Sequence, residues 1–164
     1  MSIVTIALGS NEGDREHFIR EAIQGIAAKI GQIHLCSPFY ENKAQGFDSQ
    51  NMFLNGCIAV QTKMEPDAIL FALKEIECHL GRLKNDSHGY ASRPIDLDII
   101  LFENKIVRQK NLLIPHPRFR DRIFVLRPLC DIQPNAIDPV SSKSIVELLS
   151  ACSDKSKLTL YELN

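Results

Sequence analysis

The sequence predicts an α+β fold, in which two helices cover one face of an antiparallel sheet and a C-terminal extension follows. Two stretches have the apolar spacing of helices, and four short runs have the length and β-branched content of strands. They occur in the order strand, helix, strand, strand, helix, strand. The 164 residues, 45% of them apolar and 24% charged, predict a single domain over residues 1–164.

The first half of the chain begins with an apolar run, Ile3–Leu8, that reads as a buried strand. A turn at 9–14 separates it from a helix, because apolar residues recur at helical spacing from Phe18 to Ile30 and Gly31 then ends the pattern. The next apolar segment, Gln32–Tyr40, predicts a second strand.

The second half repeats this pattern. Met52–Val60 reads as the third strand, and a second helix starts at Pro66, a favoured first helical position, and stops at Gly81. Ile95–Phe102 is the fourth strand. Two polar loops lie between these elements, Glu41–Gln50 and Leu83–Ser92.

The resulting βαββαβ order is the ferredoxin-like pattern. Beyond Lys105 the sequence predicts short extended pieces and two helices, near Asp121–Leu129 and Ser144–Leu149. These segments form the C-terminal extension of the predicted core.

Composition excludes several classes of protein. The net charge of −1 predicts no general attraction to nucleic acid, and no apolar run approaches the roughly 18 residues that span a membrane. The start of the chain has no basic region and no cleavage site, so we expect no signal peptide. Five scattered cysteines without a CxxC pair indicate reduced thiols. We therefore expect a cytoplasmic monomer that binds small molecules, without nucleic acid or membrane partners.

The most informative motif is the carboxylate pair Asp96 and Asp98. Side chains at i and i+2 of a strand point to the same face, so these two lie about 6–7 Å apart along the strand. Ile95, Leu97, Ile99 and Leu101 are expected to form the other, aliphatic face. Two like charges at the edge of a core repel, and a divalent cation removes that cost. Oxygen ligands favour Mg²⁺, with phosphates as further ligands. The pair equally fits carboxylates that cap a strand end and bond to basic neighbours.

Basic residues gather around the second loop, namely Lys74, Arg82, Lys84, His88 and Arg93. Arginine grips phosphate with two parallel hydrogen bonds, and arginines above two aspartates are the parts of metal-assisted phosphoryl transfer. The simpler interpretation is a solvated loop. Glu77 fits either an acid bonded to Arg82, the interpretation that base rates favour, or a residue that orients that arginine.

Two further features fit a bound ligand. Phe53 and Asn55 share one face of the third strand, and an aromatic ring beside a carboxamide suits a flat heterocycle. A surface phenylalanine under a loop fits nearly as well. His116 stands between Pro115 and Pro117, and a single histidine is more often structural than catalytic.

The common phosphate cradles are absent from the sequence, which has neither a Walker A loop nor a GxGxxG motif. From the residues alone, three functions stay open. They are metal-assisted phosphoryl transfer, a metal-dependent nucleotidyltransferase that releases pyrophosphate, and a non-catalytic module that binds a ligand or RNA.

Several motifs together resemble one family. They are Gly9-Ser10-Asn11, Phe39-Tyr40 before a loop that ends in Gly46, Phe53-Leu54-Asn55, Glu77 with Gly81-Arg82, Arg93-Pro94-Ile95-Asp96-Leu97-Asp98-Ile99, Ile114-Pro115-His116-Pro117-Arg118, and Phe124-Val125-Leu126 with Pro128-Leu129. From about residue 3 to about residue 135 the chain resembles the 6-hydroxymethyl-7,8-dihydropterin pyrophosphokinases of folate biosynthesis.

The resemblance implies that ATP gives its β,γ-diphosphoryl group to the hydroxymethyl group of a dihydropterin and leaves as AMP. It implies two Mg²⁺ ions on Asp96 and Asp98, and catalytic roles for these two residues with Arg82 and Arg93. On the nucleotide side it implies Leu70, Lys74, Glu77, Arg82, Lys84, Arg93, Ile99, Leu113, His116 and Arg122. On the pterin side it implies Asn42, Gln45, Gly46, Phe53, Asn55, Tyr90 and Phe124.

Overall fold

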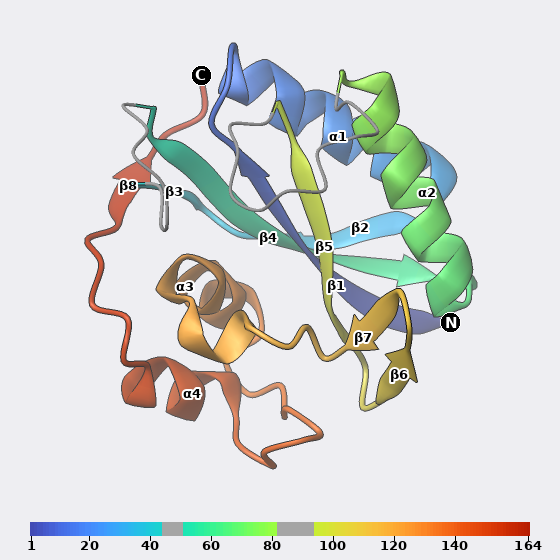
Figure 1. Cartoon of the computed structure of the whole chain (residues 1–164), viewed down its shortest axis with the longest axis vertical. Helices are drawn as coiled ribbons and strands as arrows, with labels where there is room; N and C mark the ends of the chain where they lie inside the picture. Colours follow the sequence, from blue (N-terminus) through green and yellow to red (C-terminus); the bar gives the residue numbers. More distant parts are fainter. Residues whose placement is uncertain (44–50, 82–93) are drawn as a thin grey trace.

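The structure, a computed structural model, describes residues 1–43, 51–81 and 94–164 (Figure 1). Its strands are β1 (Ser2–Ser10), β2 (Gln32–Cys36), β3 (Phe39–Asn42), β4 (Phe53–Thr62), β5 (Asp96–Phe102), β6 (Val107–Gln109), β7 (Leu112–Ile114) and β8 (Thr159–Tyr161). Its helices are α1 (Arg15–Lys29), α2 (Pro66–His79), α3 (Ile123–Ile132) and α4 (Ile145–Ala151), with a 3₁₀ turn at Phe119–Asp121.

The main sheet has the order β5-β1-β4-β3-β8, and β2 pairs with β4 beside β3. Every pairing in this sheet is antiparallel. If β2 and β3 are taken as one strand, the first four strands have the βαββαβ order and the ferredoxin-like arrangement. The predicted fold class is therefore confirmed, and β5 is left as an edge strand.

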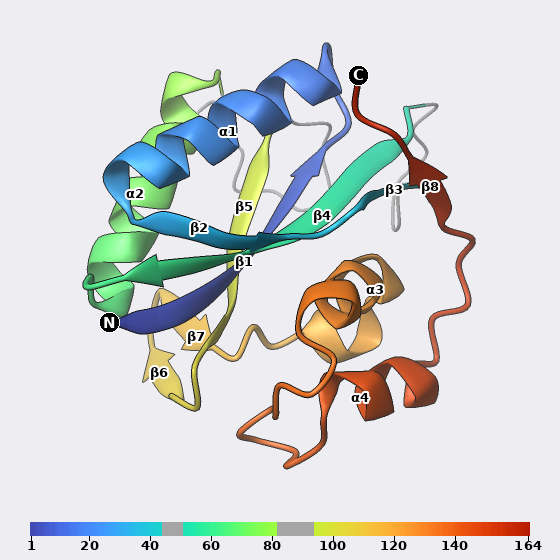
Figure 2. The ribbon, with the colours of Figure 1, turned by 180° about the vertical axis from the view of Figure 1, so that it is seen from behind.

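Two layers cover the sheet, one on each face (Figures 1 and 2). The helices of the core, α1 and α2, pack on one face over Val4, Ile6 and Leu8 of β1. The C-terminal extension covers part of the other face, where α3 and α4 bury a second apolar cluster with Cys57. Hydrophobic burial on both faces holds β1 and β4 in the middle of the molecule.

The segment predicted as one strand, Gln32–Tyr40, is two strands in the structure. Pro38 has no N–H to donate, so the ladder to β4 is interrupted there. Ser37 bonds to β4 at this gap in the ladder. Its N–H donates to the Cys57 carbonyl at 2.9 Å, and its Oγ accepts from the Cys57 N–H at 2.9 Å. The chain thus continues along β4 as β3.

The pattern predicted for the fourth strand is wrong at its end. The register between β1 and β5 shifts between Thr5 and Ile6, which leaves Ile100 as an extra residue on β5. Beyond this bulge the alternation changes face. Ile95, Leu97 and Ile99 pack under α1 and α2 as predicted, but Leu101 joins the cluster on the opposite face.

The C-terminal extension contains both predicted helices, as α3 and α4. It begins with a hairpin of β6 and β7 beside β5. It ends in β8, which the sequence did not predict and which pairs with β3 at the far edge of the sheet. Among the helices of the described residues, none combines the length and apolar character needed to cross a membrane.

The ion pair between Arg120 and buried Asp138 stabilises the turn between α3 and α4. Arg120 donates from Nε and Nη2 to the two carboxylate oxygens of Asp138, each at 2.7 Å, and the Asp138 side chain has no exposed surface. Burial alone would raise the pKa of Asp138, but the hydrogen bonds from Arg120 and Ser141 outweigh it and lower the pKa to about 2.

We expect Asp138→Asn to lower the free energy of unfolding by about 3 kcal/mol at pH 7, because Arg120 loses its buried counter-charge. A carboxylate whose pKa is lowered by folding adds stability above its unfolded value, and that stability disappears as the pH falls from about 4 to about 2. The gap between wild type and variant should therefore narrow over this range in urea titrations. Glu75→Gln, which removes the exposed Lys29–Glu75 pair, serves as control; an equal loss in both variants would contradict the assignment.

Candidate active site

The two carboxylates of β5 lie beside the neighbouring strand β1. Asp96 pairs with Gly9 and Asp98 pairs with Ala7, so all four residues share one face. This face is opposite to the one that packs on α1 and α2. The structure thus places Asp96 and Asp98 side by side, as their spacing predicts, over two small residues.

Asp98 lies in an electrostatic environment that disfavours its charge. Its side chain is 40% exposed. Burial, followed by the negative charges of Asp96 and Glu77, raises its pKa to about 7, although Arg122 and Lys74 act in the other direction. A cation at this place would relieve the repulsion.

Glu77 of α2 supports the strand that carries the pair. Its side chain is nearly fully buried, and its Oε1 accepts a hydrogen bond of 2.8 Å from the backbone N–H of Leu97. Leu97 lies between the two aspartates on β5, which is an edge strand of the sheet that the described residues form. The Glu77 carboxylate therefore accepts a backbone hydrogen bond that a neighbouring strand would otherwise accept. Lys74 approaches Glu77 Oε2 at 3.4 Å. Glu77 therefore holds β5 in place and adds negative charge near Asp98.

His116, on the segment after β7, lies close to Asp98. Its backbone N–H donates to the Ile100 carbonyl at 2.9 Å, and its Nδ1 accepts from the Arg118 N–H at 3.1 Å. The neutral ring therefore carries its proton on Nε2, which lies 4.0 Å from Asp98 Oδ2. Burial, reinforced by the positive charge of Arg122, lowers the pKa of His116 to about 4. A neutral imidazole donor thus faces the carboxylate pair at pH 7.

A second polar group lies across β1 from the aspartates. Asn55 of β4 pairs with Gly9, and Asn42 of β3 pairs with Phe53. The Asn55 Nδ2 donates to Asn42 Oδ1 at 2.6 Å, and both amides are buried. Phe53 is partly exposed beside them. An aromatic ring and two fixed amides therefore stand on the face that carries the carboxylates.

Gly9 of β1 lies between Asp96 and Asn55 and adds no side chain there. It stands in register between Asp96 on one side and Asn55 on the other. A Cβ at Gly9 would lie 2.7 Å from Asn55 Oδ1, closer than real contacts allow. The backbone of β1 thus approaches the Asn55 side chain directly. Because Gly9 has no side chain, none of its own atoms stands between Asn55 and Asp96 on this face of the sheet.

The start of α3 adds a cation and a second aromatic ring. The Arg122 guanidinium lies 5.7 Å from the centre of the Phe124 ring. Arg122 also lowers the pKa of both Asp98 and His116 by its charge. The extension therefore brings Arg122 near Asp98 and His116, with Phe124 beside it.

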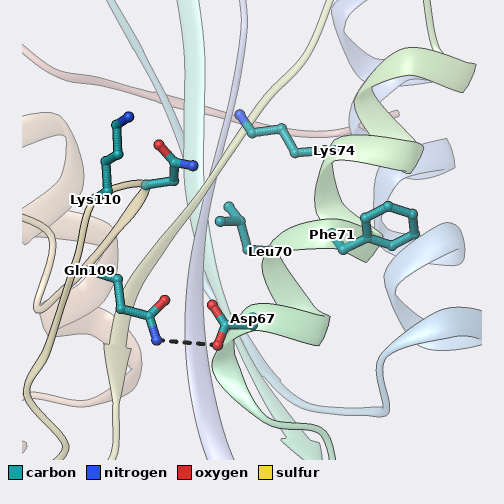
Figure 3. A pocket seen from close by; sticks show the side chains of 7 residues that line it. Asp67, Leu70, Phe71, Lys74, Gln109 and Lys110 are labelled. Carbon is teal, nitrogen blue, oxygen red and sulfur yellow. Dashed lines mark hydrogen bonds between the residues drawn. The ribbon is translucent and has the colours of Figure 1, made fainter.

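A pocket of about 710 Å³ lies between α2 and the β6–β7 hairpin (Figure 3). Leu70 and Lys74 line its α2 side, as the nucleotide assignment predicts. The remaining lining residues, which the sequence analysis missed, are Asp67, Phe71, Gln109, Lys110 and Asn111. Gln109 Nε2 donates to Asp67 Oδ2 at 3.2 Å across the pocket. No local sequence pattern marks this hairpin, because its approach to α2 depends on the fold.

The remaining predicted residues are placed differently. Ile99 is buried under the helices, and Leu113 is 46% exposed on β7; neither lines this pocket. Six predicted site residues lie outside the described residues, namely Gln45, Gly46, Arg82, Lys84, Tyr90 and Arg93. Among the described residues no three of His, Cys, Asp and Glu are grouped so that they could hold a metal ion.

The fold and this arrangement are those of a ferredoxin-like protein with a carboxylate pair on a strand of the sheet and a separate pocket beside α2. Paired carboxylates with positive charges nearby are recurring parts of metal-assisted phosphoryl transfer. The model of the family described as 7,8-dihydro-6-hydroxymethylpterin-pyrophosphokinase matches residues 5–134. The chain belongs to this family.

Relatives of known name agree with this membership. A 2-amino-4-hydroxy-6-hydroxymethyldihydropteridine pyrophosphokinase of Aquifex aeolicus is 37% identical over 147 residues, 90% of each chain. The protein of the same name from Bacillus subtilis is 38% identical over 80% of this chain and 78% of its own. The folic acid synthesis protein fol1 of Pneumocystis carinii is 43% identical over 87% of this chain, which spans 19% of that longer protein.

Solved structures support the fold. The HPPK-DHPS protein of Plasmodium falciparum, in a crystal structure with SDX-DHP, superposes with a TM-score of 0.72 at 16% sequence identity. The match covers 92% of this chain and 43% of the Plasmodium chain. At this identity the similarity establishes the architecture only.

We expect Asp98 to titrate near pH 7 in metal-free protein, because burial and its acidic neighbours raise its pKa. Asp96→Asn removes one negative neighbour and should lower that value, whereas Glu75→Gln on the exposed face of α2 should leave it unchanged. Carbon-13 NMR of the aspartate carboxyl groups measures both. Titration of Asp98 near 3.8, its ordinary value, would contradict this description of the site.

Proposed function

We propose that this chain transfers the pyrophosphoryl group of ATP to the hydroxymethyl group of 6-hydroxymethyl-7,8-dihydropterin and releases AMP. Family membership carries this proposal. It favours pyrophosphoryl transfer over a nucleotidyltransferase or a non-catalytic binding module, the two alternatives that the residues alone leave open. In the reaction, the hydroxymethyl oxygen forms a bond to the β-phosphorus, and the bond between that phosphorus and the oxygen of AMP breaks.

The donor set at β5 fits Mg²⁺. Two carboxylate groups on one face, one with a raised pKa, form a site whose repulsion a divalent cation cancels. Mg²⁺ is commonly bound by one or two carboxylates together with substrate phosphates. We propose that Asp96 and Asp98 hold two ions. When bound, these ions would neutralise phosphate charge and lower the pKa of the acceptor hydroxyl.

Residues on both sides of β5 would hold the nucleotide. The pocket between α2 and the β6–β7 hairpin offers the apolar side chain of Leu70 and the ammonium groups of Lys74 and Lys110. Neutral His116 would donate from Nε2 toward a phosphate oxygen, because its lowered pKa keeps it uncharged. Arg122 would supply fixed positive charge. The resemblance adds Arg82, Lys84 and Arg93 to this side.

The acceptor would lie across β1 from the metal. Phe53 and Phe124 offer aromatic faces for a pterin ring, and Asn55 and Asn42 offer amide groups for its polar edge. The 2.6 Å bond between these amides orients them before a ligand arrives. The resemblance adds Gln45, Gly46 and Tyr90. Small side chains on β1 would let the hydroxymethyl group reach the phosphate chain.

The proposal extends to the whole chain. Pairing of β8 with β3 joins the last residues to the same sheet, which supports a single domain over residues 1–164. We further propose a cytoplasmic monomer. Light scattering coupled to gel filtration tests the oligomeric state.

One assay tests the activity. Purified protein is incubated with ATP, Mg²⁺ and 6-hydroxymethyl-7,8-dihydropterin, and AMP is measured by chromatography. We expect AMP only when all three are present. Release of pyrophosphate would favour the nucleotidyltransferase, and folded protein that forms no AMP would overturn the proposal.

We expect Asp98→Asn to lose most Mg²⁺-dependent turnover, by roughly 10²-fold or more, while it stays folded. The substitution removes a metal ligand charge but little volume, and it also removes the charge repulsion at this site. AMP formation at saturating substrates and circular dichroism measure the two properties. Glu75→Gln, which removes an exposed carboxylate from α2, should keep wild-type turnover. Near-normal turnover of folded Asp98→Asn would defeat the metal assignment.

We expect Gly9→Ala to weaken binding of the dihydropterin, because the new methyl group displaces Asn55 from its bond with Asn42. The Michaelis constant for the pterin should rise about tenfold, equivalent to about 1.4 kcal/mol. Gly25→Ala, whose methyl group would meet only Ile76 at 3.3 Å in the helix layer, is the matched control. Equal pterin constants in the two variants would argue against the acceptor side described above.

A further inference from the structure

The side chain of Arg15, the first residue of α1, joins three segments that are distant in the sequence. Its Nη1 lies 2.7 Å from Glu41 Oε2 on β3 and donates to the Met52 carbonyl, before β4, at 2.8 Å. Its guanidinium also stacks 5.5 Å from the centre of the Tyr161 ring on β8. The side chains of Arg15 and Glu41 are only 22% and 25% exposed.

Both polar partners of Arg15 are neighbours of proposed acceptor residues. Glu41 precedes Asn42, and Met52 precedes Phe53. Asn42 and Phe53 pair directly with each other across β3 and β4. Arg15 therefore ties together the end of one strand and the start of the next, at the place where the acceptor groups are presented.

The C-terminal strand supports Arg15 from the other side. β8 pairs with β3, with Thr159 opposite Glu41 and Tyr161 opposite Phe39. Tyr161 Oη donates to Glu16 Oε1 at 2.8 Å, which fixes the ring against the start of α1. Figures 1 and 2 both show the C-terminal end beside this end of α1. An aromatic face on one side and an anion on the other leave the guanidinium little freedom.

We propose that Arg15 is a positioning residue for the acceptor side of the active site. This inference rests on the proposed function. Arg15 does not reach the reacting atoms. It holds β3 against the start of β4 through charge-assisted hydrogen bonds in a partly buried setting, and this keeps the side chains of Asn42 and Phe53 in the arrangement that a planar acceptor requires.

The test compares Arg15→Met with Lys29→Met. Methionine keeps much of the apolar length of either side chain but removes the charge. Lys29, also on α1, pairs with Glu75 in an exposed contact at 3.0 Å and has no part in the site. We expect Arg15→Met to raise the Michaelis constant for the dihydropterin about tenfold, with that for ATP and kcat within about twofold. Lys29→Met should keep wild-type constants.

Two further measurements separate positioning from simple destabilisation. Arg15→Lys retains the charge and should restore most of the pterin affinity. A smaller folded fraction alone would lower the apparent kcat or raise both Michaelis constants by the same factor, and it would not change the pterin constant selectively. Pterin binding in the presence of a non-hydrolysable ATP analogue, followed by fluorescence, reports the same difference without turnover. An unchanged pterin constant in folded Arg15→Met would overturn this inference. Wild-type protein that forms no AMP would instead overturn the proposed function.

Discussion

The site depends on what the central strand β1 places between its two neighbours. β5 carries two carboxylates and β4 carries an aromatic ring and an amide, while β1 presents only Ala7 and Gly9 between them. The other face of β1 is buried under α1 and α2 through Val4, Ile6 and Leu8. A shift of one residue in the pairing would turn these aliphatic side chains away from the core, so hydrophobic burial on one face fixes the register on the other. The placement of these two small residues between the carboxylates and the Asn55 amide is thus a consequence of core packing on the opposite side of the sheet.

Two carboxylates of this protein show how structural and functional acids differ. Hydrogen bonds from Arg120 and Ser141 lower the pKa of Asp138 to about 2, so this residue stabilises the native state at neutral pH. Burial and negative neighbours raise the pKa of Asp98 from its ordinary value of 3.8 to about 7, so this residue increasingly destabilises the native state as the pH rises between these two values. The negative charges of Asp96 and Glu77 repel the ionised form of Asp98. Such a concentration of negative charge with a perturbed pKa is typical of functional sites.

The C-terminal extension completes the site from the face that the core helices leave free. It brings His116 and Arg122 near Asp98, with Phe124 beside Arg122, and its last strand pairs with β3. The family model ends at residue 134, whereas Tyr161 lies beyond it and packs on Arg15. In this chain the edge of the sheet is therefore closed by residues outside the matched region, and the acceptor side that we propose is held from both ends of the sequence.

The sequence by itself determined the βαββαβ order, the position of Asp96 and Asp98 on one face of a strand, and the shared face of Phe53 and Asn55. These are local properties, because side-chain alternation and helical spacing follow from backbone geometry within a few residues. Tertiary structure alone decided the bulge that turns Leu101 to the other face, the pairing of β8 with β3, and the bond from Glu77 to the Leu97 N–H. It also brought Gln109 and Lys110 to the pocket beside α2. These features join residues that are distant in the sequence, and their energies come from the packing of neighbouring elements, which no local pattern records.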